Sequence, residues 1–490
     1  MTSDDAADSA GPPATDVRTL LVLGASGDLA GRLLLPGLGR LLATGRAPRL
    51  HLVGAGAEDW DDDRWRARVR DAFAVPPSIE VSDGERVDVD EVDEGVATLR
   101  RIEGETVYHQ VDVTDPAALA SLLAGCEGPA AVYFALPPAV TEKACQALRE
   151  AGVPDGTRLV LEKPFGTDLE SARRLNALLA ELVPEDQVHR VDHFLGKYTV
   201  LNVLGFRFAN RLFEPLWNSG HIERVDVVFD EVLGLEDRAR YYDHAGALVD
   251  MVQSHLLQVL AVLAMDPPAT MTARDVRGRK AEVLRATRVG DPARYSRRAR
   301  YTAGRVRDRD LGSYVDEPGV EDSRQTETLA EVVCFVDSWR WKGVPFRLRS
   351  GKALGSPRKE AVITFKDVPH LPTGLRGDSR PSRVRIGFGP DCLKVEIDVN
   401  GPGDPMVLDR VVLSTDFGAG ELPAYGEVLA GVLEGDPLLS VRGDVAEECW
   451  EVVQPVLAAW GEGAVPLEEY PAGSDGPGWD RRFPDPAFPA

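Results

Sequence analysis

VRTLLVLGASGDLA, residues 17–30, joins a compact apolar run to a turn that contains two glycines. Val17–Leu23 suits a strand that is buried on both faces. The turn Gly24–Ala30 leads into a helix-like stretch, Arg32–Thr44, and then into a second apolar run, Leu50–Val53. Strand, glycine turn, helix and strand together make the βαβ unit that holds a dinucleotide. The stretch therefore predicts a Rossmann domain.

The glycine turn is the expected place for the pyrophosphate of the cofactor. Gly24 and Gly27 would let the backbone approach the phosphates, which the positive N-terminus of the following helix attracts. Two glycines three positions apart are, by themselves, equally compatible with an ordinary turn. Their position between a strand and a helix favours the dinucleotide. The candidate cofactor-binding residues of this turn are Gly24, Ala25, Ser26, Gly27, Asp28 and Leu29.

The alternation of strands and helices continues up to residue 161. Strands are expected at Thr106–Val111, Ala131–Phe134 and Arg158–Leu161, with helices at Pro116–Leu123 and Val140–Ala151. The carboxyl ends of parallel strands face the cofactor crevice. We therefore expect cofactor contacts from the residues that follow the second of these strands, Ala135, Leu136 and Pro137.

Lys163 directly follows the last of these strands, in the sequence EKPFG. Proline fixes the turn, so this lysine is well placed to project into the crevice. Out of this context it would be read as a surface charge. Two neighbouring segments are expected to be peripheral: a charged surface helix at Asp59–Asp71 and an acidic exposed loop at 78–95.

The segment RVDHFLGK, residues 190–197, is both apolar and highly charged. Asp192, His193 and Lys197 are too many ionisable groups for a buried segment without partners, whereas its apolar residues do not suit a solvated surface. A concave site for a small anion would need both. If the segment is helical, His193 and Lys197 share one face.

The pattern changes beyond about residue 200. Val225–Leu233 alternates as a one-sided strand does, and Gly246–Met265 is a mostly apolar helix that carries several polar residues. Helices return at Glu427–Leu433 and Val445–Trp460. Because few helices separate the other strand-like runs, an antiparallel sheet is expected. These runs are Ala281–Ala286, Phe346–Leu348, Ala361–Phe365, Val384–Phe388 and Leu393–Val399.

The expected architecture is thus an α/β Rossmann domain followed by an α+β domain with a large, mainly antiparallel sheet. A chain of 490 residues also exceeds a typical single core. The predicted division is a disordered leader at 1–16, the dinucleotide-binding domain at 17–195, the α+β substrate and dimerisation domain at 196–465, and a Pro/Gly-rich tail at 466–490.

The composition excludes several classes of partner. The formal charge of −23 argues against nucleic acid, which needs a basic surface. A phosphorylated substrate must then be captured by a local basic cluster. Five scattered cysteines without a CxxC pair indicate free thiols in a reducing compartment and no metal site. The acidic N-terminus is no signal peptide, and no apolar run suggests a membrane span, so a cytoplasmic enzyme is expected.

A set of separated motifs closely resembles the glucose-6-phosphate dehydrogenase family and follows the order of that family over nearly the whole ordered chain. The motifs are GASGDLA (24–30), ALPP (135–138), EKPFGTDLESARRLN (162–176), RVDHFLGK (190–197), GFRFAN (205–210), FEPLWN (213–218), DEVLGLEDRARYYDHAGALVDMVQSHLLQ (230–258), DSWRWKGVPFRLRSGKAL (337–354) and PAYGEVLAGVLEGD (423–436). The resemblance implies the same two-domain fold and a homodimer or homotetramer.

The resemblance also implies the reaction, which is the entry to the pentose phosphate pathway. Hydride leaves C1 of glucose 6-phosphate for a nicotinamide, giving 6-phosphoglucono-1,5-lactone. His255 matches the general base that takes the proton of the C1 hydroxyl, and its ordinary pKa suits that role. Asp192 matches the carboxylate that orients this imidazole. A lone histidine in an apolar helix is otherwise often a core group, and an aspartate is often a helix N-cap.

The substrate contacts implied by the family are mostly basic and acidic side chains. His193, Lys197 and Lys163 match groups near the phosphate and the cofactor, and charge-assisted hydrogen bonds suit that role. Glu231 and Asp250 match acceptors of sugar hydroxyls. Asp250 and His255, about 140° apart around an ideal α-helix, would flank the sugar. Lys352 is a further contact, whereas Arg358 is either a second basic group or an ordinary surface charge.

The main departure from the family pattern is at the cofactor. NADP-dependent members place an arginine where this chain has Ala57, and Glu58 follows it. An anion there repels a 2′-phosphate but accepts a hydrogen bond from a ribose hydroxyl. NADP is thus the cofactor by family, and NAD is favoured by Ala57 and Glu58, although Arg32 or Arg64 could compensate.

Other departures leave two further hypotheses open. Phe194 replaces a tyrosine, Ser254 replaces an asparagine, and Gly31 and Leu33 replace lysines. These changes suit a catalytically weak regulatory paralogue, or a sugar oxidoreductase with shifted sugar specificity. The retained acidic and basic residues favour the active dehydrogenase.

Overall fold

The computed structural model describes residues 17–477 apart from 48, 75–88, 237–238, 378, 419 and 421. The chain forms two compact units. Unit 1 contains residues up to Gly166, together with Arg173–Gly196 and Leu422–Gly443. Unit 2 contains Thr167–Ala172, Lys197–Glu421 and the chain from Asp444 onward. Both units are therefore discontinuous in sequence, whereas the predicted domains are continuous.

Unit 1 is built on a seven-stranded sheet in the order β18-β6-β5-β4-β1-β2-β3. All neighbours pair in parallel except β18, which is antiparallel to β6. Strands β1 and β4 are buried along their whole length, as their continuous apolar sequences predict. The strands are β1 (Thr19–Leu23), β2 (His51–Gly56), β3 (Val107–Gln110), β4 (Ala130–Phe134), β5 (Arg158–Glu162), β6 (Val188–Val191) and β18 (Ser440–Val441).

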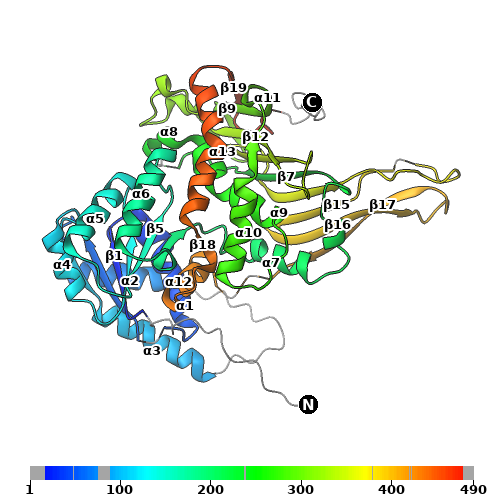
Figure 1. The fold of residues 1–490 in the computed structure, drawn as a ribbon. Helices are drawn as coiled ribbons and strands as arrows, with labels where there is room; N and C mark the ends of the chain where they lie inside the picture. Colours follow the sequence, from blue (N-terminus) through cyan, green and yellow to red (C-terminus); the bar gives the residue numbers. More distant parts are fainter. Residues whose placement is uncertain are drawn as a thin grey trace, which may run out of the picture. The chain divides into compact units, whose positions relative to one another are not determined.

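Helices alternate with these strands in the way a doubly wound fold requires. They are the π-helical turn η1 (Ala30–Leu34), α1 (Leu35–Ala43), α2 (Asp62–Phe73), α3 (Val89–Glu105), α4 (Pro116–Ala124), α5 (Pro138–Ala151), α6 (Leu169–Leu182, which crosses between the units), η2 (Glu185–Gln187), α12 (Ala424–Glu434) and η7 (Pro437–Leu439). Figure 1 shows α12, in orange, beside α1, in blue, although they are far apart in the chain. Leu38 of α1 and Leu429 of α12 belong to one buried cluster. The C-terminal part of the chain thereby completes the Rossmann core.

Unit 2 is built on a ten-stranded, mainly antiparallel sheet in the order β17-β16-β15-β14-β7-β13-β12-β9-β19, with β8 paired to β12. Among the described strands of this sheet, only β13 with β7 and β19 with β9 pair in parallel. A small hairpin, β10–β11, stands apart from this sheet. The strands are β7 (Ile222–Asp230), β8 (Thr287–Val289), β9 (Ser296–Thr302), β10 (Gly304–Val306), β11 (Arg309–Leu311), β12 (Leu329–Val336), β13 (Pro345–Gly351), β14 (Arg358–Phe365), β15 (Arg383–Phe388), β16 (Asp391–Asn400), β17 (Leu408–Asp416) and β19 (Leu467–Pro471).

The helices of unit 2 include one buried, apolar central helix. Its stretch Tyr241–Ala264 is long and apolar enough to cross a membrane, contrary to the expectation from sequence, but 94% of its most apolar window is buried. Such burial is typical of a core helix. The helices are α7 (Tyr198–Phe208), η3 (Glu214–Leu216), α8 (Ala239–Ala247), the π-helix η4 (Leu248–Leu256), α9 (Leu257–Ala264), α10 (Ala273–Arg285), α11 (Pro292–Tyr295), η5 (Tyr314–Asp316), η6 (Asp322–Arg324) and α13 (Gly443–Gly461).

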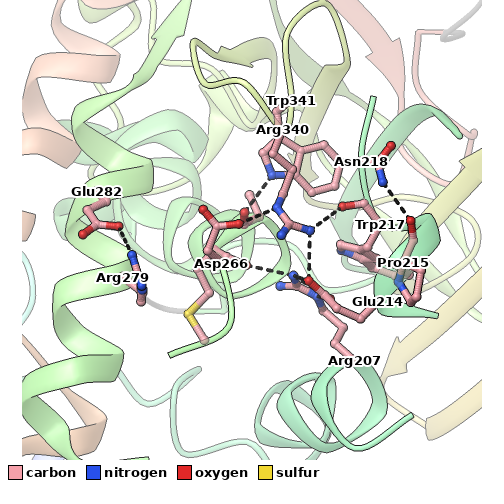
Figure 2. Close-up of polar contacts among 12 residues, drawn as sticks. Arg207, Glu214, Pro215, Trp217, Asn218, Asp266, Arg279, Glu282, Arg340 and Trp341 are labelled. Carbon is pink, nitrogen blue, oxygen red and sulfur yellow. Dashed lines mark hydrogen bonds and ion pairs between the residues drawn. The ribbon is translucent and has the colours of Figure 1, made fainter. Parts of the chain in front are cut away.

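The C-terminal end of α9 is held by a cluster of arginines and tryptophans. Arg207 is fully buried and donates to the carbonyls of Val262, Leu263 and Met265 at 2.8–3.1 Å. Figure 2 shows Arg207 directed at Glu214, which also accepts from Arg340. Acceptors at a helix C-terminus otherwise lack partners, so this cluster fixes the end of α9.

Tryptophans donate to two carbonyls at the same helix end, that of Leu263, which Arg207 also contacts, and that of Ala264. Trp217 Nε1 donates to Leu263 O at 2.8 Å, and Trp341 Nε1 donates to Ala264 O at 2.7 Å. The motifs GFRFAN, FEPLWN and DSWRWKG therefore share a structural purpose, because each supplies one of these donors. We call the set Arg207, Trp217, Arg340 and Trp341 the helix clamp.

Four expectations from sequence differ from the structure. Ala281–Ala286, predicted as a strand, lies mostly in α10, where buried Val276, Lys280 and Leu284 follow a helical spacing. Residues 89–95 of the predicted loop 78–95 are helical, and residues 78–88 lie outside the described residues. Residues 193–196 form a turn, so the helical geometry that would place His193 and Lys197 on one face is not adopted. Part of the predicted tail forms strand β19.

Candidate active site

The glycine turn of unit 1 packs tightly against the end of the neighbouring strand. Gly24 has φ +82°, and a Cβ there would lie 2.4 Å from Ala135 O and 2.8 Å from Leu136 Cδ2. Only glycine fits such a position without strain. Gly27 N donates to Gly24 O at 3.0 Å, which closes the turn. The structure therefore brings the predicted turn and the segment that begins at Ala135 together at the carboxyl edge of the sheet.

Glu58 faces the same turn from the end of β2. Ser26 Oγ donates to Glu58 Oε2 at 2.5 Å, so the carboxylate is held beside the glycines. A Cβ at Gly56 would lie 2.8 Å from the Tyr108 hydroxyl and 3.1 Å from Glu58. Burial, followed by the charge of Glu58, raises the pKa of Tyr108. Tyr108 thus stays a neutral hydroxyl beside a carboxylate at physiological pH.

Two arginines of α2 contact the glycine turn and the loop that follows β2, although Ala57 itself brings no charge. Arg64 lies over the ring of Trp60 at 4.5 Å. Arg68 donates to Gly27 O at 2.6 Å and thus supports the turn. Arg32, by contrast, is exposed and pairs loosely with Asp28 at 3.8 Å. Arg64 is therefore the better placed of the two cations that could compensate for the missing arginine.

Lys163 follows β5 next to a carboxyl group with unusual surroundings. The Tyr133 hydroxyl donates to Glu162, and Tyr425 also hydrogen-bonds to it. Removal from water raises the pKa of Glu162 to about 7, against the effect of these hydrogen bonds and of Lys163. Glu162 and the two tyrosines were not predicted from sequence, and the EKP sequence at a strand end was the signal available for Glu162.

The segment 190–196 leaves β6 as a tight turn. Asp192 is fully buried and accepts from Phe194 N at 3.0 Å, so it also stabilises the local turn. His193 stacks on Tyr425 with the ring centroids 5.5 Å apart. A Cβ at Gly196 would lie 2.4 Å from Ala424 O. Helix α12 therefore positions both His193 and the glycine that precedes Lys197.

In unit 2, Lys197 shares an aromatic ring with a second lysine. Lys197 Nζ lies 6.0 Å and Lys359 Nζ lies 4.5 Å from the centroid of Phe229. Burial lowers the pKa of Lys197, Asp391 opposes that change, and Lys359 reinforces it. Two cations this close repel each other, so the pair favours an anion as its third member.

Arg358 lies on the other face of the same strand. In β14, Arg358 is opposite Asp230 and Lys359 is opposite Phe229. Successive side chains of a strand point to opposite faces. Arg358 Nε bonds to Glu360 at 2.9 Å. Sequence reasoning selected Arg358 and not Lys359, and the alternation of side chains along β14 places the two on opposite faces.

The predicted sugar contacts Glu231 and Lys352 are directly paired. Lys352 Nζ donates to Glu231 Oε2 at 2.8 Å. The same ammonium group lies 5.2 Å from the ring of Tyr242. The hydroxyl of Tyr242 is buried and has no hydrogen-bond partner among the described residues. Tyr242 was also missed, because a tyrosine in an apolar helix gives no distinct sequence signal.

Asp250 and His255 both lie in the π-helix η4, buried to 7% and 1% exposure. A π-helix closes its hydrogen bonds between residues five positions apart, so a side chain lies near the one five positions earlier. The separation expected for an ideal α-helix is therefore wrong here. Insertions of π geometry are common at functional sites, because they redirect a side chain.

No group of three or more His, Cys, Asp or Glu side chains that could hold a metal occurs within the described part of the chain. All five cysteines are free thiols. Burial raises the pKa of Cys126 to about 11 and that of Cys145 and Cys334 to about 12. These three thiols are therefore protonated and unreactive at neutral pH.

Two protein-family models together cover most of the chain. Residues 21–202 match the glucose-6-phosphate dehydrogenase NAD binding domain, and residues 204–483 match the glucose-6-phosphate dehydrogenase C-terminal domain. The chain is similar to the glucose-6-phosphate 1-dehydrogenase of Mycolicibacterium smegmatis, with 37% identity over 95% of each chain. It is also similar to that of Treponema pallidum, with 36% identity over 94% of this chain and 92% of the relative.

Solved structures agree with these matches. The glucose-6-phosphate 1-dehydrogenase of Mycobacterium avium has a TM-score of 0.80 and 33% identity, covering 94% of this chain and 95% of its own. A glucose-6-phosphate dehydrogenase in complex with its substrate has a TM-score of 0.81 and 28% identity, covering 95% and 97%. A Rossmann unit, a mainly antiparallel second unit and similarity over nearly the full length make this chain a member of the glucose-6-phosphate dehydrogenase family.

Proposed function

We propose that the protein oxidises D-glucose 6-phosphate at C1 to 6-phosphoglucono-1,5-lactone, with transfer of hydride to a nicotinamide cofactor. The observation that carries this proposal is the match to the family over nearly the whole length of both units. The chemistry needs a base, a phosphate site and a cofactor site. The described residues of the two units offer all three.

His255 is the proposed general base. It takes the proton of the C1 hydroxyl while hydride leaves the same carbon, so that a carbonyl forms. Asp192 is the proposed partner that orients the imidazole and stabilises its charged form. Support comes from the burial of both groups, since a buried carboxylate needs a polar partner.

The sugar is bound by hydrogen-bond acceptors and one ammonium group. Glu231 and Asp250 accept from sugar hydroxyls, and Lys352 donates. The 2.8 Å ion pair between Lys352 and Glu231 supports this assignment, because it orders both groups before the sugar arrives.

The phosphate is bound by His193, Lys197 and Lys359, with Lys163 between substrate and cofactor. Lys359 is preferred to Arg358 because it shares the Phe229 ring with Lys197, whereas Arg358 is paired with Glu360. Charge-assisted hydrogen bonds to a phosphate are typically strong, which offsets the acidic charge of the whole chain.

The cofactor site fits a dinucleotide, since the glycine turn ends in a helix N-terminus whose first N–H groups lack partners within the helix. When bound there, the nicotinamide cofactor accepts the hydride. We favour NAD over NADP because Ser26 fixes Glu58 next to the turn at 2.5 Å, where it accepts from a ribose hydroxyl. Ala57 provides no cation for a 2′-phosphate.

Two finer proposals concern the cell and the assembly. A protein with five free thiols fits the cytoplasm. A homodimer or homotetramer is supported by exposed apolar side chains on the edge strand β17, Val412 at 52% and Leu413 at 60% exposure. Light scattering after size exclusion tests the assembly, and a monomer would contradict it.

One absorbance assay tests the function and its alternatives. Reduced nicotinamide is followed with glucose 6-phosphate or glucose, and with NAD or NADP. We expect turnover with glucose 6-phosphate and a higher kcat/KM with NAD. Absence of turnover with the phosphorylated sugar would support a regulatory paralogue, and turnover with glucose alone would support a shifted specificity. A tenfold preference for NADP, about 1.4 kcal/mol, would refute the cofactor assignment.

A further inference from the structure

The helix that carries Asp250 and His255 begins in an unusual way. Gly246 has φ +65° and ends the regular geometry of α8. The residue before η4, Ala247, has no side chain that could cap the helix. The first N–H groups of a helix need acceptors, and a buried helix start without them is unstable.

A glutamate from a distant part of unit 2 supplies these acceptors. Glu327 Oε1 accepts from Leu248 N at 2.9 Å, and its backbone carbonyl accepts from Ala247 N at 3.3 Å. Glu327 stands before β12 and is only 7% exposed. A Cβ at Gly246 would lie 2.4 Å from Glu327 Oε1. The glycine and the glutamate are therefore fitted to each other.

The neighbours of Glu327 hold the backbone of Lys352, the other part of the candidate sugar site. Thr328 O accepts from Lys352 N at 2.9 Å, and Tyr470 Oη donates to Lys352 O at 2.7 Å. Thr326 Oγ1 donates to Asp243 O at 2.7 Å in α8. The segment 326–328 thus anchors Lys352 on one side and the start of η4 on the other.

The charge of Glu327 is costly at this place. Burial raises its pKa to about 7, against the backbone hydrogen bonds and the charge of Arg298. Arg298 on β9, Tyr242 on α8 and Tyr314 on η5 are the charged and titratable groups whose interaction with it is resolved. An apolar side chain would be easier to bury. The carboxyl group is therefore explained by its hydrogen bond to the start of the helix.

We propose that Glu327 is a positioning residue of the reaction, which acts through η4 by fixing the helix start that sets the places of Asp250 and His255. The inference rests on the proposed function. Helix η4 runs directly into α9. The helix clamp fixes the C-terminal end of α9, and Glu327 fixes the start of η4. The polar residues between them are thereby held in one register.

The test compares Glu327→Gln and Glu327→Ala with the control Glu331→Gln. Glu331 is also buried, and burial raises its pKa to about 7, but it pairs with Arg297 and Arg349 on β9 and β13. We expect Glu327→Ala to lower kcat and to raise KM for glucose 6-phosphate, each about tenfold, which corresponds to about 1.4 kcal/mol. KM for the cofactor, which binds unit 1, is expected to stay unchanged.

The conservative variant separates positioning from folding. Glu327→Gln keeps an oxygen acceptor for Leu248 N, so it is expected to restore most of kcat and KM. Glu331→Gln is expected to change the melting temperature while both kinetic constants stay near wild type. Gly246→Ala, which forces Glu327 away, is expected to reproduce the defect of Glu327→Ala.

Three results would overturn the inference. They are unchanged kinetics in folded Glu327→Ala, no rescue by glutamine, or equal kinetic losses in Glu331→Gln. If Glu327→Ala does not fold, Gly246→Ala and Glu327→Gln give the same decision. A wild-type protein without activity on glucose 6-phosphate would instead refute the proposed function. The substrate-induced shift in melting temperature, measured on wild type and Glu327→Ala, then still reports whether Glu327 supports sugar binding.

Discussion

The two candidate half-sites are built from different materials. In unit 1 the cofactor half is made of backbone turns and short side chains at the carboxyl ends of parallel strands, such as Gly24 and Ala135. In unit 2 the sugar half is made of long side chains from two strands and a π-helix, such as Lys359 and His255. A half built from backbone can be predicted from local pattern, whereas a half built from side chains depends on register and helix type.

The strongest test of the sugar half is the loss of His255, the proposed base. His255→Asn is expected to lower kcat by about 10²–10⁴-fold, the usual contribution of general base catalysis, with little change in KM. Initial rates under saturating substrate measure this. His244→Asn, at an exposed site on α8, is the matched control. A variant that retains turnover would remove His255 as the base.

The matching test of the cofactor half changes backbone rather than chemistry. Gly24→Ala places a Cβ 2.4 Å from Ala135 O at φ +82°, so the turn must move. We expect kcat/KM for the cofactor to fall about 10–100-fold, from a loss of about 1.5–3 kcal/mol in charge-assisted hydrogen bonding to the phosphates. KM for glucose 6-phosphate is expected to stay unchanged.

Gly104→Ala in α3 is the control for this change, because a Cβ there meets nothing within 4 Å. Equal losses in the two variants would show that the turn has no special role.

The phosphate pair tests whether strand register decides function in unit 2. Lys197→Ala and Lys359→Ala are each expected to raise KM for glucose 6-phosphate about tenfold, because each removes a charge-assisted hydrogen bond. Arg358→Ala is expected to change KM less, since Arg358 is paired with Glu360. If Arg358→Ala raised KM for glucose 6-phosphate more than Lys359→Ala did, the phosphate contact would be Arg358, as predicted from sequence.

A milder change tests the reading of Glu58. Ala57→Arg introduces a cation that would attract a 2′-phosphate, and we expect the NADP/NAD ratio of kcat/KM to rise about tenfold. The ratio is measured from initial rates with each cofactor. If the ratio does not move, Arg64, which lies over Trp60, already serves the 2′-phosphate.

The last test concerns how stability depends on pH through two buried carboxyl groups, one in each unit. Burial raises the pKa of Glu162 and Glu331 to about 7, above the ordinary value of 4.5. The folded protein then holds protons that the unfolded chain releases, so stability falls as the pH rises from about 4.5 to 7.

Glu162→Gln and Glu331→Gln are each expected to flatten this fall, by no more than about 3 kcal/mol for each group. Calorimetric melting temperatures between pH 5 and 8 measure the slope. An unchanged slope would contradict the assigned protonation.

Much of the fold follows from the sequence for a physical reason. Strands β1, β4 and β5 are buried on both faces and read as continuous apolar runs, which the sequence pattern identifies directly. Ala281–Ala286 was misassigned as a strand because a short apolar run in a buried amphipathic helix resembles one.

The site was less accessible to prediction than the fold. Lys359 and Arg358 are adjacent in β14 and therefore point to opposite faces, but only the pairing of β14 with β7 shows which of them lies opposite Phe229. Glu327 acts through a contact with Leu248, 79 positions earlier in the chain. Local patterns carry no information on such distant pairs, nor on the π geometry of η4.

That π geometry has a consequence for chain length. The continuous helix of η4 and α9 is anchored at both ends. Glu327 holds Leu248 at its start, and Arg207 and Trp217 hold the carbonyl of Leu263 near its end. The two anchors fix the length of helix between them. A π turn takes in more residues than an α turn. Deleting a single residue could thus be absorbed by conversion to α geometry, which would keep the fold but rotate His255 relative to Asp250. In this helix the loss of one residue would therefore leave the fold intact and misalign the two site residues.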